Sequence, residues 1–89
     1  MKRCTLDGTT LPNAAAVYRV LAGAFAFPDY FGNNPDALWD ALTEYSGDPV
    51  EIVWDNSQRS AERFGPEYAA IVAALHAAAA EGRLALRLT

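Results

Sequence analysis

The hydrophobic and polar positions of the chain follow strand and helix spacing in consecutive short segments. Residues 2–6 alternate polar and apolar positions, with Cys4 and Leu6 on one face, which is typical of a half-buried strand. Asp7-Gly8 then predicts a turn. The chain is therefore expected to begin with a strand.

A helix is predicted from Asn13, whose side chain can cap it, to about Phe25. Pro28 cannot continue this helix, so residues 26–33 are predicted to form a loop rich in Pro, Asp, Gly and Asn. The apolar stripe of the helix repeats at the helical period and consists of Val17, Val20, Leu21, Ala24 and Phe25.

A second helix is predicted over residues 35–44. Asn34 followed by Pro35 places a capping side chain before a proline at the first helical position, which is a strong helix start. The same spacing argument predicts that this helix buries Leu38, Ala41 and Leu42.

The second half of the chain predicts two further strands and two further helices. Residues 50–54, VEIVW, are nearly all apolar and predict a central strand covered on both faces. A short helix is predicted over residues 56–63. The longest helix is expected to begin at Gly65-Pro66-Glu67 and to stop at Gly82. Its core stripe is Tyr68, Ile71, Val72 and Leu75, and residues 83–88 then alternate strictly, with Leu84, Leu86 and Leu88 on one face.

The order strand–helix–helix–strand–helix–helix–strand predicts the fold class. Helical crossovers connect parallel strands, so we expect an α/β fold with a small three-stranded parallel sheet packed with about four helices. The chain contains no internal repeat, low-complexity tract or linker. Residues 1–89 are therefore expected to form a single domain.

Composition favours a folded protein of a reducing compartment. The hydrophobic content of 52% argues against disorder, and a lone cysteine excludes an intramolecular disulfide and every multi-cysteine metal site. The first residues, MKRCTLDG, are not followed by an apolar run, so no signal peptide is expected. No segment approaches the roughly 18 apolar residues that span a membrane. These features predict a cytoplasmic location and no membrane partner.

Charge is distributed unevenly along the chain. The net charge is −4, yet seven acids and no base lie between Val20 and Gln58, and all seven Lys and Arg residues lie outside that span. Binding to nucleic acid is disfavoured, because phosphate contacts need clustered Lys and Arg. A basic protein is the more natural partner.

Three of these acids form the candidate site. Asp36, Asp40 and Glu44 follow one another at steps of four residues, so they share one face of the second helix. A solvated helix face is the simplest interpretation of such a run. However, Trp39 on the helix and Tyr30 in the preceding loop place large aromatic side chains beside unpaired acids, a composition that favours a protein-binding hot spot.

Catalytic and metal-binding alternatives are weaker. Two carboxylates can perform acid–base catalysis, but the chain is small for a substrate cleft, and no second cluster supplies a nucleophile or oxyanion donors. A hard cation takes six or more oxygen ligands, which acids on one helix face cannot provide. His76, the one histidine, makes neither a triad nor a zinc site. The sequence therefore predicts no enzyme, no metal and no cofactor.

Residues 27–42, FPDYFGNNPDALWDAL, resemble the barstar family, the intracellular ribonuclease inhibitors of bacteria. The family pattern P-x-Y-[YF]-G-x-N-x-D-A-L-W-D is filled at every fixed position. The resemblance extends over essentially the whole chain, including the Ala-rich helix that ends at Ala80-Glu81-Gly82. It implies a three-stranded parallel sheet with helices, and an inhibitor whose helix after the loop plugs the active site of a small secreted ribonuclease.

The resemblance also implies residue roles. Asp40 should enter the catalytic pocket of the ribonuclease and mimic the substrate phosphate, and Asp36 should pair with a basic residue at its rim. The complete set of partner-binding residues expected on this basis is Tyr30, Phe31, Gly32, Asn34, Pro35, Asp36, Trp39, Asp40, Thr43, Glu44 and Tyr45.

Outside the fixed positions of this pattern, four residues differ from those found in other family members. Tyr45 replaces the usual Trp, Pro35 replaces an apolar Leu, Glu44 stands where the reference inhibitor has Gly, and Ala77 stands where some members place a Glu. These departures bear on the identity of the cognate enzyme more than on the mode of binding.

The sequence thus predicts a non-enzymatic inhibitor that binds a secreted ribonuclease before export, protects the producing cell and is a monomer when free. One alternative is an immunity protein, or antitoxin, against a different nuclease toxin. Another is an acidic protein-interaction domain with no nuclease partner.

Overall fold

The computed structural model describes residues 2–89; residue 1 of the predicted domain lies outside this range. The predicted order of strands and helices is confirmed. The elements are β1 (Lys2–Asp7), α1 (Ala14–Phe25), α2 (Pro35–Glu44), β2 (Val50–Asp55), α3 (Ser57–Phe64), α4 (Pro66–Ala80) and β3 (Leu84–Leu88).

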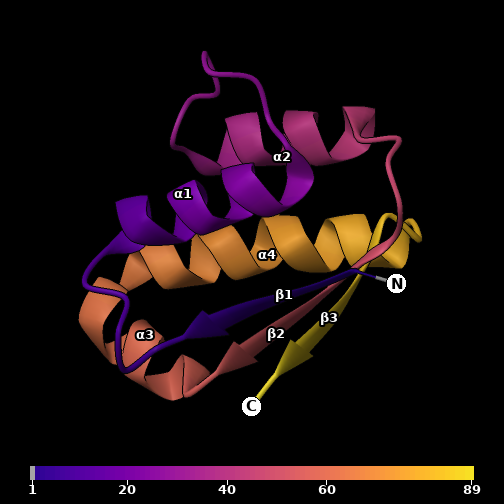
Figure 1. The fold of residues 1–89 in the computed structure, drawn as a ribbon. Helices are drawn as coiled ribbons and strands as arrows, with labels where there is room; N and C mark the ends of the chain where they lie inside the picture. Colours follow the sequence, from indigo (N-terminus) through magenta and orange to yellow (C-terminus); the bar gives the residue numbers. More distant parts are fainter. Residues whose placement is uncertain (1) are drawn as a thin grey trace.

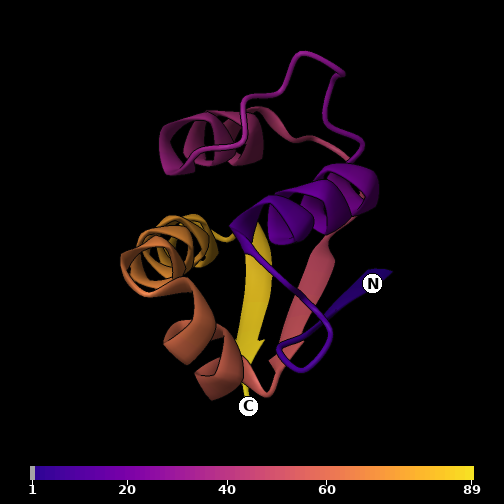
Figure 2. The same ribbon diagram turned by 90° about the vertical axis from the view of Figure 1, so that its left-hand side faces the viewer.

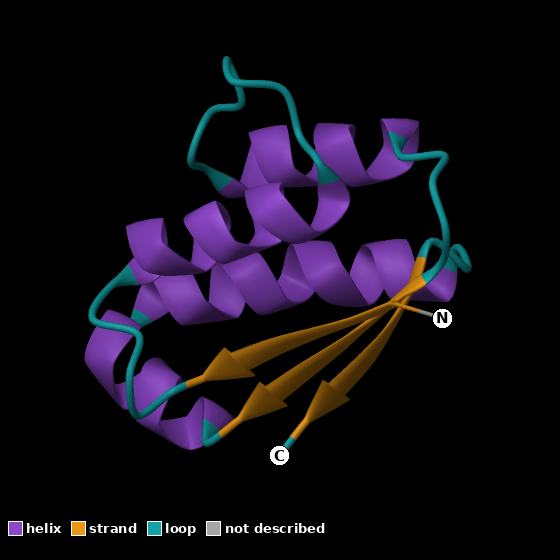
Figure 3. Cartoon of the chain, in the orientation of Figure 1, coloured by secondary structure: helices purple, strands orange, loops and turns teal. Residues whose placement is uncertain are grey.

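The strands form one parallel sheet with β2 in the centre, as the crossover argument predicts (Figure 3). Ile52 is in register with Cys4 of β1 and with Leu86 of β3. Because side chains alternate across a strand, this register places the apolar positions of all three strands on one face.

The helices are arranged in layers above that face. Figures 1 and 2 show α1 and α4 lying over the sheet, α2 packed outside them, and α3 beyond the carboxyl ends of the strands. The buried side chains form one cluster between the sheet and the helices. Fully buried members of this cluster include Leu6, Val17, Leu21, Ile52, Trp54, Ile71 and Leu75.

The expectation that β2 is covered on both faces is wrong. Burial alternates along the strand, because the helices cover only one face of the sheet. On the other face, Glu51 forms an ion pair with Arg3 of β1, with 3.0 Å between Oε1 and Nε. Val50, Ile52 and Trp54 are buried, whereas Glu51, Val53 and Asp55 are half-exposed.

Three predicted apolar positions lie outside the core. Ala41 of α2 is only half-buried and is not part of the core cluster, because the buried face of this helix is limited to Leu38 and Leu42. Val20 is 37% exposed, because the buried face of α1 turns instead toward Tyr18, whose ring is 6.2 Å from the ring of Phe31. Leu88 is 36% exposed, because the carboxyl end of β3 runs away from α4 (Figure 1). No helix within residues 2–89 is long and apolar enough to cross a membrane.

Candidate protein-binding site

The start of α2 is fixed by the cap that the sequence predicts. The side-chain oxygen of Asn34 accepts a hydrogen bond of 2.8 Å from the backbone N–H of Ala37, and Pro35 occupies the first turn. Leu38 and Leu42 are fully buried on the inner side of the helix. The rotation of α2 about its own axis is therefore set by its core contacts.

This rotation turns the acidic face outward. Asp36, Asp40 and Glu44 are all exposed. Their carboxylates form no hydrogen bond or ion pair with any other residue in the described part of the chain. The three acids therefore remain available to a partner, and each adjacent like-charge pair costs about 0.2–0.5 kcal/mol in the free helix.

The loop before α2 is anchored to the core by a series of contacting aromatic rings. Ring centroids are 5.5 Å apart between Phe25 and Phe27, and 4.8 Å apart between Phe27 and Phe31. Tyr45, at the carboxyl end of α2, packs edge-on against Phe25 at 4.9 Å. Such contacts make the loop part of the packed structure.

Tyr30 is the exception among these aromatic residues, because 88% of its surface is exposed. It lies in the loop that projects from the body of the molecule between α1 and α2 (Figure 3). A backbone hydrogen bond from Phe31 N–H to Pro28 C=O closes the turn that contains Tyr30, and one from Asn34 N–H to Gly32 C=O closes the turn that follows; both are 2.9 Å long. A large, solvent-facing aromatic on an ordered loop is typical of a binding surface.

An open groove of about 760 Å³ lies between this loop and α2. Asp40 and Glu44 line it on the side of the helix, whereas Asp36 does not. No Lys, Arg or His of the described chain lines it. The predicted partner-binding residues that line the groove are Tyr30, Phe31, Gly32, Asp40, Glu44 and Tyr45.

The remaining predicted residues lie outside the groove. Asn34 and Pro35 form the helix start, and Asp36 is exposed on the first turn. Trp39 and Thr43 are half-buried one turn apart on the other flank of α2. The structure thus divides the predicted partner-binding residues into three groups: those that line the groove, those at the start of α2, and those on the flank of α2 outside the groove.

Several groove residues have no counterpart in the predicted set. Ala37 and Ala41 line the groove beside the acids; their spacing from Asp40 and Glu44 along the helix could have revealed them, and their small side chains leave room between helix and loop. Gly47 also contributes, and a Cβ atom there would lie 2.7 Å from Tyr45 Oη. Phe25, Ala26, Phe27, Pro28 and Ser46 complete the lining.

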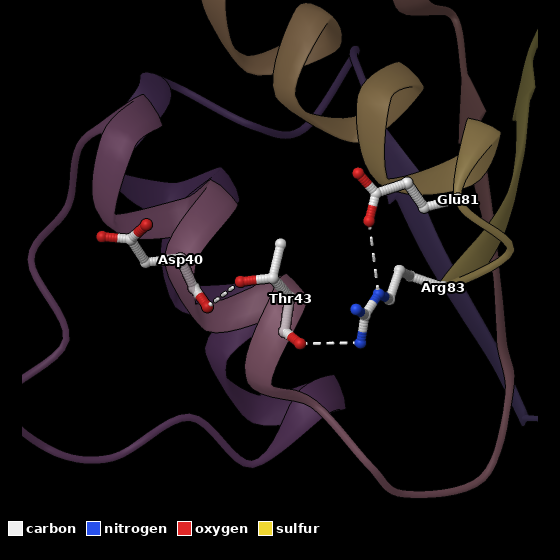
Figure 4. Close-up of polar contacts among 4 residues, drawn as sticks. All are labelled: Asp40, Thr43, Glu81 and Arg83. Carbon is white, nitrogen blue, oxygen red and sulfur yellow. Dashed lines mark hydrogen bonds and ion pairs between the residues drawn. The ribbon is translucent and has the colours of Figure 1, made fainter.

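A residue far away in the sequence supports the carboxyl end of α2. Arg83, between α4 and β3, donates a hydrogen bond of 2.6 Å from Nη1 to the backbone oxygen of Thr43 (Figure 4). Its Nε lies 3.7 Å from a carboxylate oxygen of Glu81. No sequence pattern predicts this contact, because the two partners are 40 residues apart.

The chemistry of the groove favours a cationic protein group. Carboxylates attract Lys, Arg or protonated His, and the adjoining aromatic rings can pack against the apolar part of such side chains. Within residues 2–89 no three His, Cys, Asp or Glu side chains are grouped closely enough to hold a metal ion. Binding of a basic protein surface is the chemistry that this arrangement best supports.

Two comparisons with known proteins bear on this site. A protein of Bacillus subtilis (strain 168) named "Putative ribonuclease inhibitor YrdF" is 37% identical over 60 residues, which are 67% of this chain and 66% of that protein. The chain thus covers slightly less than two thirds of that relative. The family model described as "Barstar (barnase inhibitor)" matches residues 1–87. This match extends over nearly the entire sequence, and the chain belongs to the barstar family.

Proposed function

We propose that this protein inhibits a small secreted microbial ribonuclease by blocking its active site with α2 and the loop before it. The observation that carries the proposal is the outward-facing acidic face of α2, whose carboxylates are unpaired, in a chain of the barstar family. This face lies beside a groove that no Lys, Arg or His of the described residues lines. Ribonucleases must bind the phosphates of RNA, and cationic side chains do so through charge-assisted hydrogen bonds. An exposed carboxylate can take the place of such a phosphate.

Asp40 is the phosphate mimic in this proposal. It stands between Asp36 and Glu44 on the exposed face, and it lines the groove. Asp36 lies outside the groove, which suits an ion pair with a basic residue at the rim of the enzyme's pocket. Tyr30 provides exposed aromatic surface on the opposite wall.

The packing of the site favours tight binding. The contacting aromatic rings hold the loop in place, and the buried leucines of α2 hold the helix. Both sides of the groove are therefore ordered in the free protein. A surface that is already ordered loses less conformational entropy on association. In this proposal the protein is a monomer without catalytic activity that binds the ribonuclease in the cytoplasm, before the ribonuclease is exported.

A nuclease toxin of another type is the second candidate partner. Glu44 adds a second carboxylate to the groove at a position where the reference inhibitor has Gly, and Ala77 lacks the acid of some family members. This altered pattern of carboxylates suits an enzyme whose active site has a different arrangement of basic side chains. A captured enzyme that cleaves DNA would favour this second candidate.

Capture of the partner tests the proposal. The protein is immobilised and exposed to lysate and culture medium of the producing organism, and bound proteins are eluted at high salt. We expect the eluate to hydrolyse RNA, and this activity to disappear when an equimolar amount of the soluble protein is added at low salt.

The matched control is a column carrying the Asp40→Ala variant. It should retain much less ribonuclease activity, because the proposed phosphate mimic is absent. Equal RNA-hydrolysing activity from both columns, or none from either, would contradict the proposed function.

A further inference from the structure

We infer that Arg83 is a positioning residue for partner binding: it holds the carboxyl end of α2 and thereby orients Asp40 and Glu44 toward the groove. This inference rests on the proposed function for the identity of the partner. The contact that carries it, from the guanidinium of Arg83 to the backbone oxygen of Thr43, belongs to the free protein.

The carboxyl end of α2 lacks the usual means of stabilisation. The last four carbonyl groups of a helix have no partner within the helix, and the helix dipole places partial negative charge there. The last turn of α2 contains no basic residue, and Glu44 adds a negative charge at this end. The Tyr45 N–H to Leu42 C=O hydrogen bond is 3.3 Å long. A ten-residue helix of this kind depends on external contacts.

Arg83 supplies a contact of the required kind. Its Nη1 lies 2.6 Å from the Thr43 carbonyl oxygen, and Glu81 restrains the guanidinium from the other side at 3.7 Å (Figure 4). The side chain is 37% exposed, so it is partly shielded from solvent. A cation that donates to an unpaired carbonyl both satisfies the hydrogen bond and interacts favourably with the partial negative charge of the helix dipole at this end.

The same turn carries the acids of the groove. The Thr43 hydroxyl donates a 2.8 Å hydrogen bond to the backbone oxygen of Asp40, and Glu44 follows Thr43 directly. In Figure 4 the carboxylate of Asp40 points away from Arg83. Arg83 thus supports the backbone of the acidic turn without pairing with its carboxylates, and fraying of this turn would displace both acids that line the groove.

The sign of a mutational effect separates positioning from simple electrostatics. Arg83 is a positive charge close to a surface proposed to bind a basic enzyme. If charge alone mattered, removing it would strengthen binding. If Arg83 positions the acids, removing it weakens binding despite the more negative surface.

Arg63 provides a matched control. Its Nη1 donates a 2.8 Å hydrogen bond to the Leu11 backbone oxygen, so Arg63→Gln also removes one guanidinium–carbonyl bond and one positive charge. Arg63 lies in α3, at the other end of the molecule from the carboxyl end of α2 (Figure 1). Both substitutions should lower stability, but only Arg83→Gln should affect the acidic turn.

Two measurements test the inference. The first is the dissociation constant for the ribonuclease recovered in the capture experiment, which we expect Arg83→Gln to raise about 5- to 20-fold and Arg63→Gln to leave within about twofold. Arg83→Lys, which keeps a charged donor, should recover part of the loss. The second is amide hydrogen exchange in the free protein, which should accelerate at the carboxyl end of α2 in Arg83→Gln and not in Arg63→Gln.

Binding by Arg83→Gln that equals or exceeds that of Arg63→Gln would overturn the inference, as would unchanged exchange in α2. Asp40→Ala, measured in the same series, separates this outcome from failure of the proposed function. If Asp40→Ala binds as well as the unchanged protein, the proposed function falls, and hydrogen exchange alone decides whether Arg83 orders the turn.

Discussion

Asp36, Asp40 and Glu44 are chemically alike and evenly spaced, yet their surroundings differ. Asp40 and Glu44 line the groove opposite the loop, whereas Asp36 stands outside it. Spacing in the sequence places all three on one helix face but contains no information about the loop packed beside it. The difference in their surroundings therefore follows from tertiary structure, and it agrees with the separate roles proposed for Asp36 and Asp40.

Glu44 is predicted to lower the stability of the free protein and to strengthen the complex. It repels Asp40 one turn earlier, and its negative charge interacts unfavourably with the partial negative charge of the helix dipole at the carboxyl end of α2. We expect Glu44→Gln to raise the free energy of unfolding by about 0.3–1 kcal/mol, measured by urea titration. The same variant should bind the captured ribonuclease more weakly, with a smaller dependence on salt.

The control for this prediction is Glu62→Gln, which removes an exposed acid from α3. It should change the affinity little. Tighter binding of the Glu44→Gln variant at low salt would show that Glu44 repels the partner.

Asp7 is predicted to make stability depend on pH. The Thr9 N–H and hydroxyl and the Asn56 side chain donate to its carboxylate, at 2.9, 2.7 and 3.2 Å, and these hydrogen bonds hold the pKa of Asp7 below its ordinary value of 3.8. A folded-state pKa below the unfolded one contributes stability that is present above pH 3.8 and is lost as pH falls through the folded-state pKa.

Thermal unfolding between about pH 6 and pH 2 tests this linkage. The Asp7→Asn variant should melt below the unchanged protein at pH 6, and the difference should shrink as Asp7 becomes protonated. Asp29→Asn, a control at an exposed loop carboxylate with no hydrogen bond to another described residue, should show no such convergence. A difference between Asp7→Asn and the unchanged protein that stays constant with pH would rule out the proposed contribution.

At the scale of elements, α2 owes its boundaries to local sequence and its orientation to the core. The Asn34-Pro35 start is readable from the sequence, because capping and proline geometry act over a few residues. The one-sided cover of β2 is not readable in the same way. Val53 is apolar but lies on the open face, and only the placement of every helix on the other face decides its exposure.

Substitutions of the two capping asparagines, Asn13 and Asn34, distinguish an effect on helix stability from an effect on the binding site. Asn13 caps α1 through a 3.0 Å bond to the Ala16 N–H, as Asn34 caps α2. We expect Asn13→Ala and Asn34→Ala each to lower the free energy of unfolding by about 0.5–2 kcal/mol. Only Asn34→Ala should also weaken ribonuclease binding, because α2 alone carries the acidic face.

Denaturant titration and affinity measurements on both variants check this prediction. Asn34→Ser, whose hydroxyl can also cap the helix, should recover stability and most of the binding. Equal losses of affinity in Asn13→Ala and Asn34→Ala would argue against a specific role for the position of α2.

At the scale of the whole molecule, acidic residues are concentrated in the segment that carries the proposed binding site. The segment between Val20 and Gln58 contains seven acids and no base, and it includes both α2 and the loop before it. The parallel sheet could be predicted because helical crossovers leave few alternatives. The Arg83–Thr43 contact could not, because it joins residues 40 positions apart that no periodic pattern relates.

Long-range attraction should therefore accompany the short-range fit. An acidic surface steers a basic enzyme toward the groove, so the association rate should be fast at low salt and fall as salt is added. Asp40 should act differently from a remote acid, because it is proposed to enter the enzyme's pocket and lose its water there.

The most direct measurement compares the affinities of Asp40→Ala and Glu62→Ala for the captured ribonuclease. Both variants remove one exposed carboxylate. The proposed site predicts that Asp40→Ala weakens the complex by about 2–5 kcal/mol, whereas Glu62→Ala has no measurable effect. Equal effects of the two substitutions would contradict the placement of the binding site on α2.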